Sequence, residues 1–81
     1  MKQIIYTADQ MGHVLASRRK ALKLSQKSVA DKLGIVQSRL SVLEEDPSRL
    51  TLDRLIALAN LLGLEISLQL KSADPKPQSE W

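Results

Sequence analysis

The sequence predicts a mostly α-helical domain of four to five helices, followed by one β-strand and a disordered tail. Apolar residues recur at helical spacing over most of residues 8–62, which is typical of amphipathic helices. Leucine and alanine are abundant, Phe is absent, and Gly and Pro contribute three residues each. Apolar and polar residues then alternate over residues 64–71, as in a half-buried strand. We therefore expect a folded domain at residues 1–71 and a flexible tail at residues 72–81.

Length and composition exclude several classes of protein. The chain has 81 residues, which suits one small domain, and it has no cysteine for disulfide bonds or thiolate metal sites. No cluster of histidine and carboxylates, glycine-rich phosphate loop or metal-ligand spacing is present, so we predict no enzyme, no cofactor and no catalytic or metal-binding residue. No stretch resembles a membrane span or a signal peptide, so we expect a cytoplasmic protein.

Positive charge is concentrated in the first half of the chain. Residues 1–39 carry eight Lys or Arg and two acidic residues, a net charge of +6. Residues 40–81 carry four basic and seven acidic residues, a net charge of −3. This asymmetry favours a surface that meets a polyanion such as nucleic acid, although an ordinary solvated surface would have the same composition.

Capping residues mark the starts of the first two predicted helices. Thr7, followed three residues later by Gln10, forms a capping box that begins a helix over residues 8–23. Ser25 caps the second helix, which Gly34 ends by adopting a left-handed backbone conformation. These signals therefore predict two consecutive helices separated by a short connection.

The last predicted helix leads directly into the predicted strand. Thr51 caps this helix after a turn at residues 45–49, and Gly63 ends it. A single strand cannot satisfy its own backbone groups, so it must pair with residues 4–6 or with the same strand of a second subunit. We favour the second subunit, because a dimer would complete so small a core. The predicted dimerisation residues are the alternating apolar ones: Leu64, Ile66, Leu68 and Leu70.

The functional motif lies in residues 26–45, where two short helices, residues 26–33 and 37–45, are joined by a turn. This is the helix-turn-helix arrangement, whose second helix lies in the major groove of DNA. Ala30 is small where the second helix crosses close to it, and Gly34 permits the tight turn. The spacing therefore predicts a DNA-binding unit.

Residues 24–44 read Leu-Ser-Gln-x3-Ala-x2-Leu-Gly-Ile-x-Gln-Ser-x-Leu-Ser-x-Leu-Glu. This pattern resembles the Cro/repressor type of helix-turn-helix family, which includes phage repressors and XRE regulators. The resemblance covers about residues 9–63, and its apolar, small, glycine and glutamine positions all agree. It implies a homodimeric, nucleoid-associated repressor that binds palindromic double-stranded operator DNA.

The resemblance also implies roles for individual side chains. It places Gln26 on a phosphate and Gln37 at the start of the recognition helix, where Gln37 can pair with both hydrogen-bonding groups of adenine. Val36 and Val42 would lie near the groove, in positions where the family often has polar residues, and a methyl contact to thymine is an option for them. The full set of predicted DNA-binding residues is Arg18, Arg19, Gln26, Lys27, Gln37, Ser38, Arg39, Ser41 and Val42.

A closer resemblance is to the HipB-type antitoxins of the same family. The shared features are the short length, the Tyr-Thr cap, a strand directly after the fourth helix and a polar tail ending in Glu-Trp. The resemblance implies a toxin–antitoxin system in which the dimer represses its own operon and neutralises a HipA-type serine/threonine kinase toxin. Trp81 is the only tryptophan, and a large aromatic residue on a flexible tail suits an anchor for that partner.

Two other functions remain open from the sequence. Residues 9–63 fit a stand-alone phage-type or host repressor without a toxin partner equally well. A protein-interaction module, whose basic half binds an acidic protein, would have the same charge asymmetry.

Overall fold

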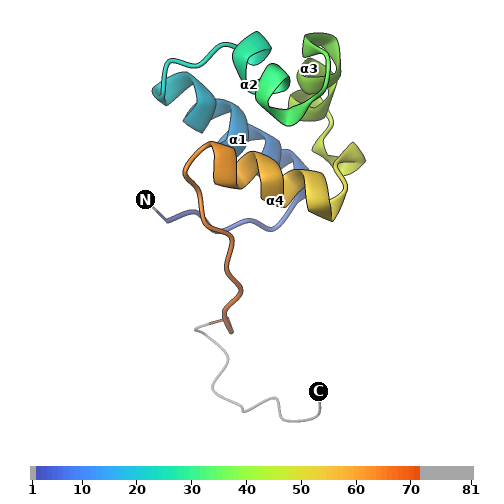
Figure 1. The fold of residues 1–81 in the computed structure, drawn as a ribbon. Helices are drawn as coiled ribbons and strands as arrows, with labels where there is room; N and C mark the ends of the chain where they lie inside the picture. The colour runs from blue at the N-terminus through green and yellow to red at the C-terminus, as the bar shows by residue number, and fades with distance from the viewer. Residues whose placement is uncertain (1, 72–81) are drawn as a thin grey trace.

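The computed structural model describes residues 2–71. Within them the chain forms four α-helices and one 3₁₀ turn (Figure 1). This agrees with the predicted mostly helical class. The elements are α1 (Ala8–Ala21), α2 (Gln26–Leu33), α3 (Gln37–Glu45), η1 (Pro47–Arg49) and α4 (Leu52–Leu61). No helix in this part of the chain is long and apolar enough to cross a membrane.

Side-chain caps begin three of these helices. Thr7 forms the predicted capping box at α1, where its hydroxyl accepts from the N–H of Gln10 and the Gln10 side chain accepts from the Thr7 N–H. The hydroxyls of Ser25 and Thr51 accept from backbone N–H groups in the first turns of α2 and α4. α3 begins at Val36 and has no side-chain cap. Of the two helices of the predicted helix-turn-helix, α2 therefore has a side-chain cap and α3 has none.

α1 ends two residues earlier than the sequence predicts. Lys23 has a φ of 58°, in the left-handed region, and its N–H bonds to the carbonyl of Lys20. The left-handed residue turns the chain away from the helix axis. Leu22, within the predicted helix, consequently lies outside α1 and is 39% exposed.

The core lies where the four helices meet. Helix α2 contributes two buried residues to it, while α1 and α3 contribute one each. Partly buried leucines and Ile35 surround the core. The cluster holds α2 and α3 as a rigid pair against α1 and α4 (Figure 1). Its members, none more than 2% exposed, are Leu15, Val29, Ala30, Leu40, Leu58 and Leu62.

A close approach between α1 and η1 occurs at Gly12. A Cβ atom at this glycine would lie 2.7 Å from the carbonyl oxygen of Glu44 and 2.8 Å from Cγ of Pro47. Both Gly12 and Pro47 are buried. The missing side chain therefore lets α1 pack directly on the end of α3 and the turn that follows it.

The predicted strand at residues 64–71 does not form in the single chain. Leu64 packs against the core, but Leu68 is 99% exposed and Leu70 is 70% exposed. No residue from 2 to 71 belongs to a strand, and residues 4–6 do not pair with this segment. The physical reason is that a strand exists only when a neighbouring backbone accepts and donates its hydrogen bonds, and one chain supplies no such neighbour here.

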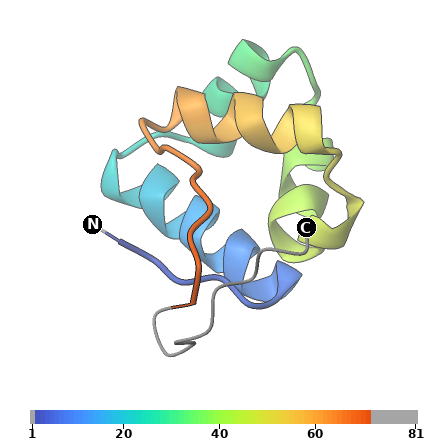
Figure 2. The same cartoon turned by 90° about the horizontal axis from the view of Figure 1, so that it is seen from below.

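The extended segment after α4 crosses the N-terminal segment on the side of the molecule opposite α2 and α3 (Figure 1 and Figure 2). The ammonium of Lys71 lies 5.7 Å from the centre of the Tyr6 ring, within the range of a cation–π contact. Both segments place apolar side chains on the surface, with Ile4 at 62% and Tyr6 at 69% exposure. Trp81 and the rest of the predicted tail lie outside the described residues.

Candidate nucleic-acid interface

The turn between α2 and α3 is fixed by backbone geometry and by burial. Gly34 has a φ of 75°, which ends α2, and the N–H of Ile35 bonds to the carbonyl of Ala30 at 3.0 Å. Ala30 is 1% exposed and Leu40 of α3 is fully buried, so the two helices cross at a close contact. α3 therefore has one face on the core and the other on the surface.

The outward face of α3 carries most of the predicted base-reading residues. Gln37, Ser38, Arg39 and Val42 are exposed, and Ser41 is half-buried. Val36, immediately before the helix, is 68% exposed. Because these side chains project from a helix that the core holds on its other side, they form one rigid surface.

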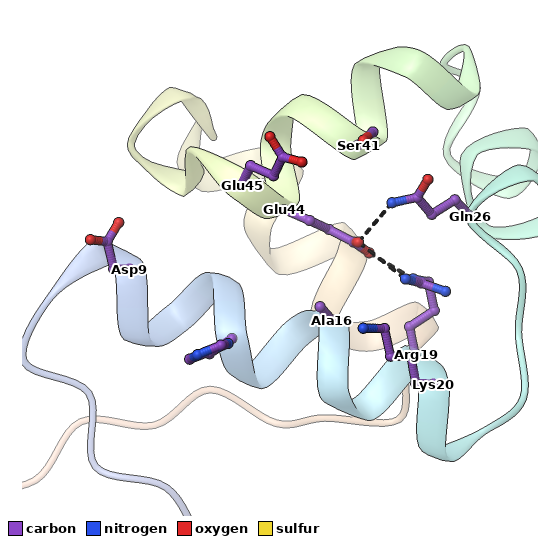
Figure 3. Close-up of a pocket in the computed structure, with 9 residues that line it drawn as sticks. Asp9, Ala16, Arg19, Lys20, Gln26, Ser41, Glu44 and Glu45 are labelled. Atoms are coloured by element: carbon purple, nitrogen blue, oxygen red, sulfur yellow. Dashed lines mark hydrogen bonds and ion pairs between the residues drawn. The ribbon is translucent and has the colours of Figure 1, made fainter.

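A chain of polar contacts connects the start of α3 to α1. The Gln37 side chain donates to the side-chain oxygen of Gln26 at 3.4 Å. The Gln26 amide in turn donates to Oε1 of Glu44 at 3.0 Å. Figure 3 shows Gln26 and Arg19 both pointing at the Glu44 carboxylate. The contacts orient Gln26 and Gln37 toward each other at the surface shared by α2 and α3.

Arg19 is buried, and its guanidinium forms hydrogen bonds within this network. Its Nε donates to Oε2 of Glu44 at 2.7 Å, and Nη2 donates to Oε1 at 3.2 Å. Nη1 donates to the carbonyl of Leu24 at 2.9 Å. The two side chains of the pair are only 10% and 9% exposed. The predicted phosphate contact of Arg19 would require breaking these bonds.

Arg18 also makes its contact inside the chain. Its Nε donates to the carbonyl of Leu62 at 2.9 Å, at the C-terminal end of α4. A cation there satisfies a carbonyl that the helix leaves unpaired and interacts favourably with the helix dipole. The predicted phosphate role of Arg18 would compete with that contact.

Two other basic residues of the predicted set, Lys27 and Arg39, are exposed. Nζ of Lys27 lies 3.0 Å from Oδ2 of Asp31, but the side chains are 72% and 63% exposed. Such an exposed pair contributes little, so Lys27 can exchange its partner for a phosphate. Arg39 is exposed and forms no ion pair with another residue of the described part. Lys27 and Arg39 are therefore the best placed cations for contacts to a polyanion.

Sequence reasoning missed the roles of Glu44 and Arg54. Glu44 accepts from both Arg19 and Gln26, and Arg54 of α4 donates to the carbonyl of Leu33, the last residue of α2, at 3.2 Å. An acidic residue inside the predicted motif, four positions from an apolar core residue, is the only available hint for Glu44. The sequence around Arg54 contains no signal that would distinguish it from an arginine exposed to solvent.

An open groove of about 630 Å³ lies between α1 and α3 (Figure 3). It mixes basic and acidic side chains, so it does not suit a polyanion. The described residues include no group of His, Asp and Glu that could hold a metal ion. The surface that remains for function is the one around α3. The groove residues are Asp9, His13, Ala16, Arg19, Lys20, Gln26, Ser41, Glu44 and Glu45.

A sequence model described as helix-turn-helix matches residues 15–69, which is most of the chain. The chain belongs to the Cro/C1-type helix-turn-helix family. A search of curated proteins gave no match. In helix-turn-helix terms α2 is the first helix of the motif and α3 is the recognition helix. Membership indicates a sequence-specific DNA-binding regulator.

Proposed function

We propose that this protein is a transcriptional repressor that binds a palindromic operator as a homodimer. The observation that supports this most strongly is the exposed face of α3, held rigidly by the core in a helix-turn-helix chain. A helix presented in this way fits the width of the major groove of B-form DNA. Repression then requires only that the bound dimer occlude the promoter.

Gln37 is the residue best suited to direct base recognition. It is exposed at the first position of α3, and its amide is oriented by Gln26. The oxygen of a glutamine amide can accept from the N6 amino group of adenine while its NH₂ group donates to adenine N7, so the side chain matches adenine. Lys27 and Arg39 supply charge for flanking phosphates, which carry affinity without sequence information.

The dimer in this proposal forms through the segment after α4. Ile66, Leu68 and Leu70 are 44%, 99% and 70% exposed in the single chain. Pairing with the same segment of a second copy would bury these side chains and satisfy the backbone groups. Two recognition helices would then reach half-sites about one helical turn apart, roughly 34 Å.

The DNA-binding proposal is tested by fluorescence anisotropy with the DNA upstream of the protein's own gene and a scrambled duplex. We expect tighter binding to the upstream DNA and a steep loss of affinity as salt is raised, because bound phosphates release counterions. Gln37→Ala should lower the preference for the upstream DNA. Lys27→Ala should weaken binding to both duplexes and reduce the salt slope by about one. Equal affinity for both duplexes at every salt concentration would refute the proposal.

The dimer proposal is tested separately by sedimentation. The full chain should sediment at twice its 9.0 kDa mass, and Leu68→Glu should shift it to the monomer. Leu68 is almost fully exposed in the single chain, so the substitution leaves the monomer fold intact. Gln69→Glu, which adds the same charge at the exposed position next to Leu68 on the other side of the alternating pattern, is the control for added negative charge. A wild-type chain that stays monomeric at high concentration contradicts the dimer.

We further propose that the repressor is the antitoxin of a HipA-type serine/threonine kinase toxin. The support is the sequence resemblance and the single tryptophan at position 81. The test is kinase activity of a purified HipA-type toxin with increasing amounts of the full chain or of Trp81→Ala. Neutralisation that weakens in the variant supports the antitoxin role and the anchor. No inhibition by the full chain favours the alternative, a repressor without a toxin partner.

A further inference from the structure

Two valines stand among polar side chains on the surface of the recognition helix. Val36 is 68% exposed and Val42 is 41% exposed. Scattered apolar residues are common on protein surfaces. These two, however, flank Gln37 and Ser38 on the face that the proposed function presents to DNA.

The residue at position 36 forgoes a stabilising contact. Its backbone, with φ −78° and ψ 154°, has the conformation of an N-cap, but its side chain cannot accept a hydrogen bond. The caps of α1, α2 and α4 are Thr7, Ser25 and Thr51, each of which accepts one. A serine at position 36 would stabilise the helix. A valine at this position is consistent with its methyl groups contacting a binding partner.

Val42 lies on the same face of α3 as Ser38. The two positions are four residues apart, so they are neighbours on the helix surface. The short side chain of Ser38 leaves Val42 accessible, and Val42 is 41% exposed. The middle of this face can therefore make apolar contacts but few hydrogen bonds to base edges.

Thymine supplies the matching chemistry. The edges of the four base pairs in the major groove carry hydrogen-bonding groups, and the C5 methyl of thymine is their one apolar group. We propose that Val36 and Val42 select thymine by contacting this methyl, on either side of the adenine read by Gln37. The inference rests on the proposed DNA-binding function and adds the residues that decide part of its specificity.

The charge of the surroundings favours DNA over an apolar protein partner for these valines. Arg39 lies between them in sequence and is exposed, and Lys27 and Lys32 are exposed on α2. Asp31 is the one acid among residues 26–42, against three cations, so this stretch has a net charge of +2. A partner with a negative backbone and apolar methyl groups complements this surface, and duplex DNA has both.

The test begins with duplexes selected in vitro from a random pool by the full-length chain. Each thymine of the best duplex is then replaced by deoxyuridine, which removes the C5 methyl and keeps every hydrogen-bonding group. We expect a loss of about fourfold in affinity at one or two positions in each half-site, the factor for one buried methyl group. Replacement at the remaining thymines should leave affinity unchanged.

Variants assign the methyl contacts to the valines. Val36→Ala and Val42→Ala should each remove the preference for thymine over uracil at one of those positions. Val42→Thr keeps one methyl at this site and should keep part of the preference. Gln37→Ala is the matched control, because it should weaken binding to the thymine and uracil duplexes by the same factor. Circular dichroism confirms that each variant is folded.

The outcomes separate the inference from the function on which it rests. If selection enriches no sequence, the DNA-reading function fails and the inference fails with it. If a sequence is enriched but uracil is tolerated everywhere, the function stands and the inference is overturned. It is also overturned if both alanine variants retain the full preference for thymine.

Discussion

Arg19 of α1 and Glu44 of α3 form a buried ion pair with two hydrogen bonds, at 2.7 and 3.2 Å. The residues are 25 positions apart in the chain. Glu44 also accepts from Gln26, so the pair connects α1, α2 and α3 at one point. In the proposed function this point lies directly behind Gln37, whose side chain bonds to Gln26.

Removing either member of this pair should strongly destabilise the fold. Arg19→Ala or Glu44→Ala leaves an uncompensated buried charge, which costs about 3–5 kcal/mol. A domain of this size has roughly 4–12 kcal/mol of stability in total, so the variants should lose from about a quarter to all of it. Urea denaturation followed by circular dichroism measures the change.

The double variant Arg19→Met with Glu44→Leu should regain much of the lost stability, because no charge is left buried. Lys27→Ala is the matched control, since its ion pair with Asp31 is exposed and contributes less than about 0.5 kcal/mol. Single variants of Arg19 or Glu44 as stable as the Lys27 variant would contradict a structural role for the buried pair.

Gly12→Ala should destabilise the protein, although alanine favours helices. The added Cβ would clash with the Glu44 carbonyl at 2.7 Å and with Pro47 at 2.8 Å. Overpacking of this kind costs about 1–3 kcal/mol, which exceeds the gain of about 1 kcal/mol in helix propensity. Ala57→Gly, at an exposed position of α4, measures the propensity difference alone. A more stable Gly12→Ala variant in thermal unfolding would exclude the close approach.

Val36→Ser should stabilise the fold by about 1 kcal/mol, because serine can cap α3. Thr51→Ala, which removes the existing cap of α4, should lose a similar amount and serves as the reverse control. Both are measured by urea denaturation. If the serine variant gains nothing, a side chain at position 36 does not reach the N–H groups of the first turn. If the variant is more stable yet binds its duplex less well, the valine serves binding at the expense of stability.

Asp46 should make the fold sensitive to acid. The hydroxyl of Ser48 and then the guanidinium of Arg49 lower the pKa of this carboxyl from its ordinary value. A group whose pKa is lower in the folded state adds stability above its unfolded pKa, and this stability is lost as pH falls through the folded value. The window therefore lies below about pH 4.

Asp46→Asn should flatten the pH dependence of unfolding in this acid window and change little at neutral pH. Carboxyl chemical shifts measured by nuclear magnetic resonance would locate the Asp46 titration directly. Ser48→Ala removes the largest cause of the shift and should raise the pKa of Asp46. An unchanged Asp46 titration in that variant would assign the shift to Arg49 instead.

Local sequence patterns predicted the helices and the exposed face of α3 well. The capping box at Thr7, the glycine turn at Gly34 and the exposure of Gln37 each depend on residues within one or two turns. The end of α1 was missed because the left-handed conformation of Lys23 has no residue signature. The strand at residues 64–71 was not found in the single chain, because alternation predicts which side chains share a face but supplies no pairing partner.

The sequence by itself determined which segments are helical and that α3 presents polar residues outward. These properties follow from periodicity and capping, which act over a few residues. Only the tertiary structure decided that Arg18 and Arg19 form hydrogen bonds inside the chain, to the Leu62 carbonyl and the Glu44 carboxylate. Their partners are 44 and 25 positions away, and the packing of the helices brings them within hydrogen-bonding distance.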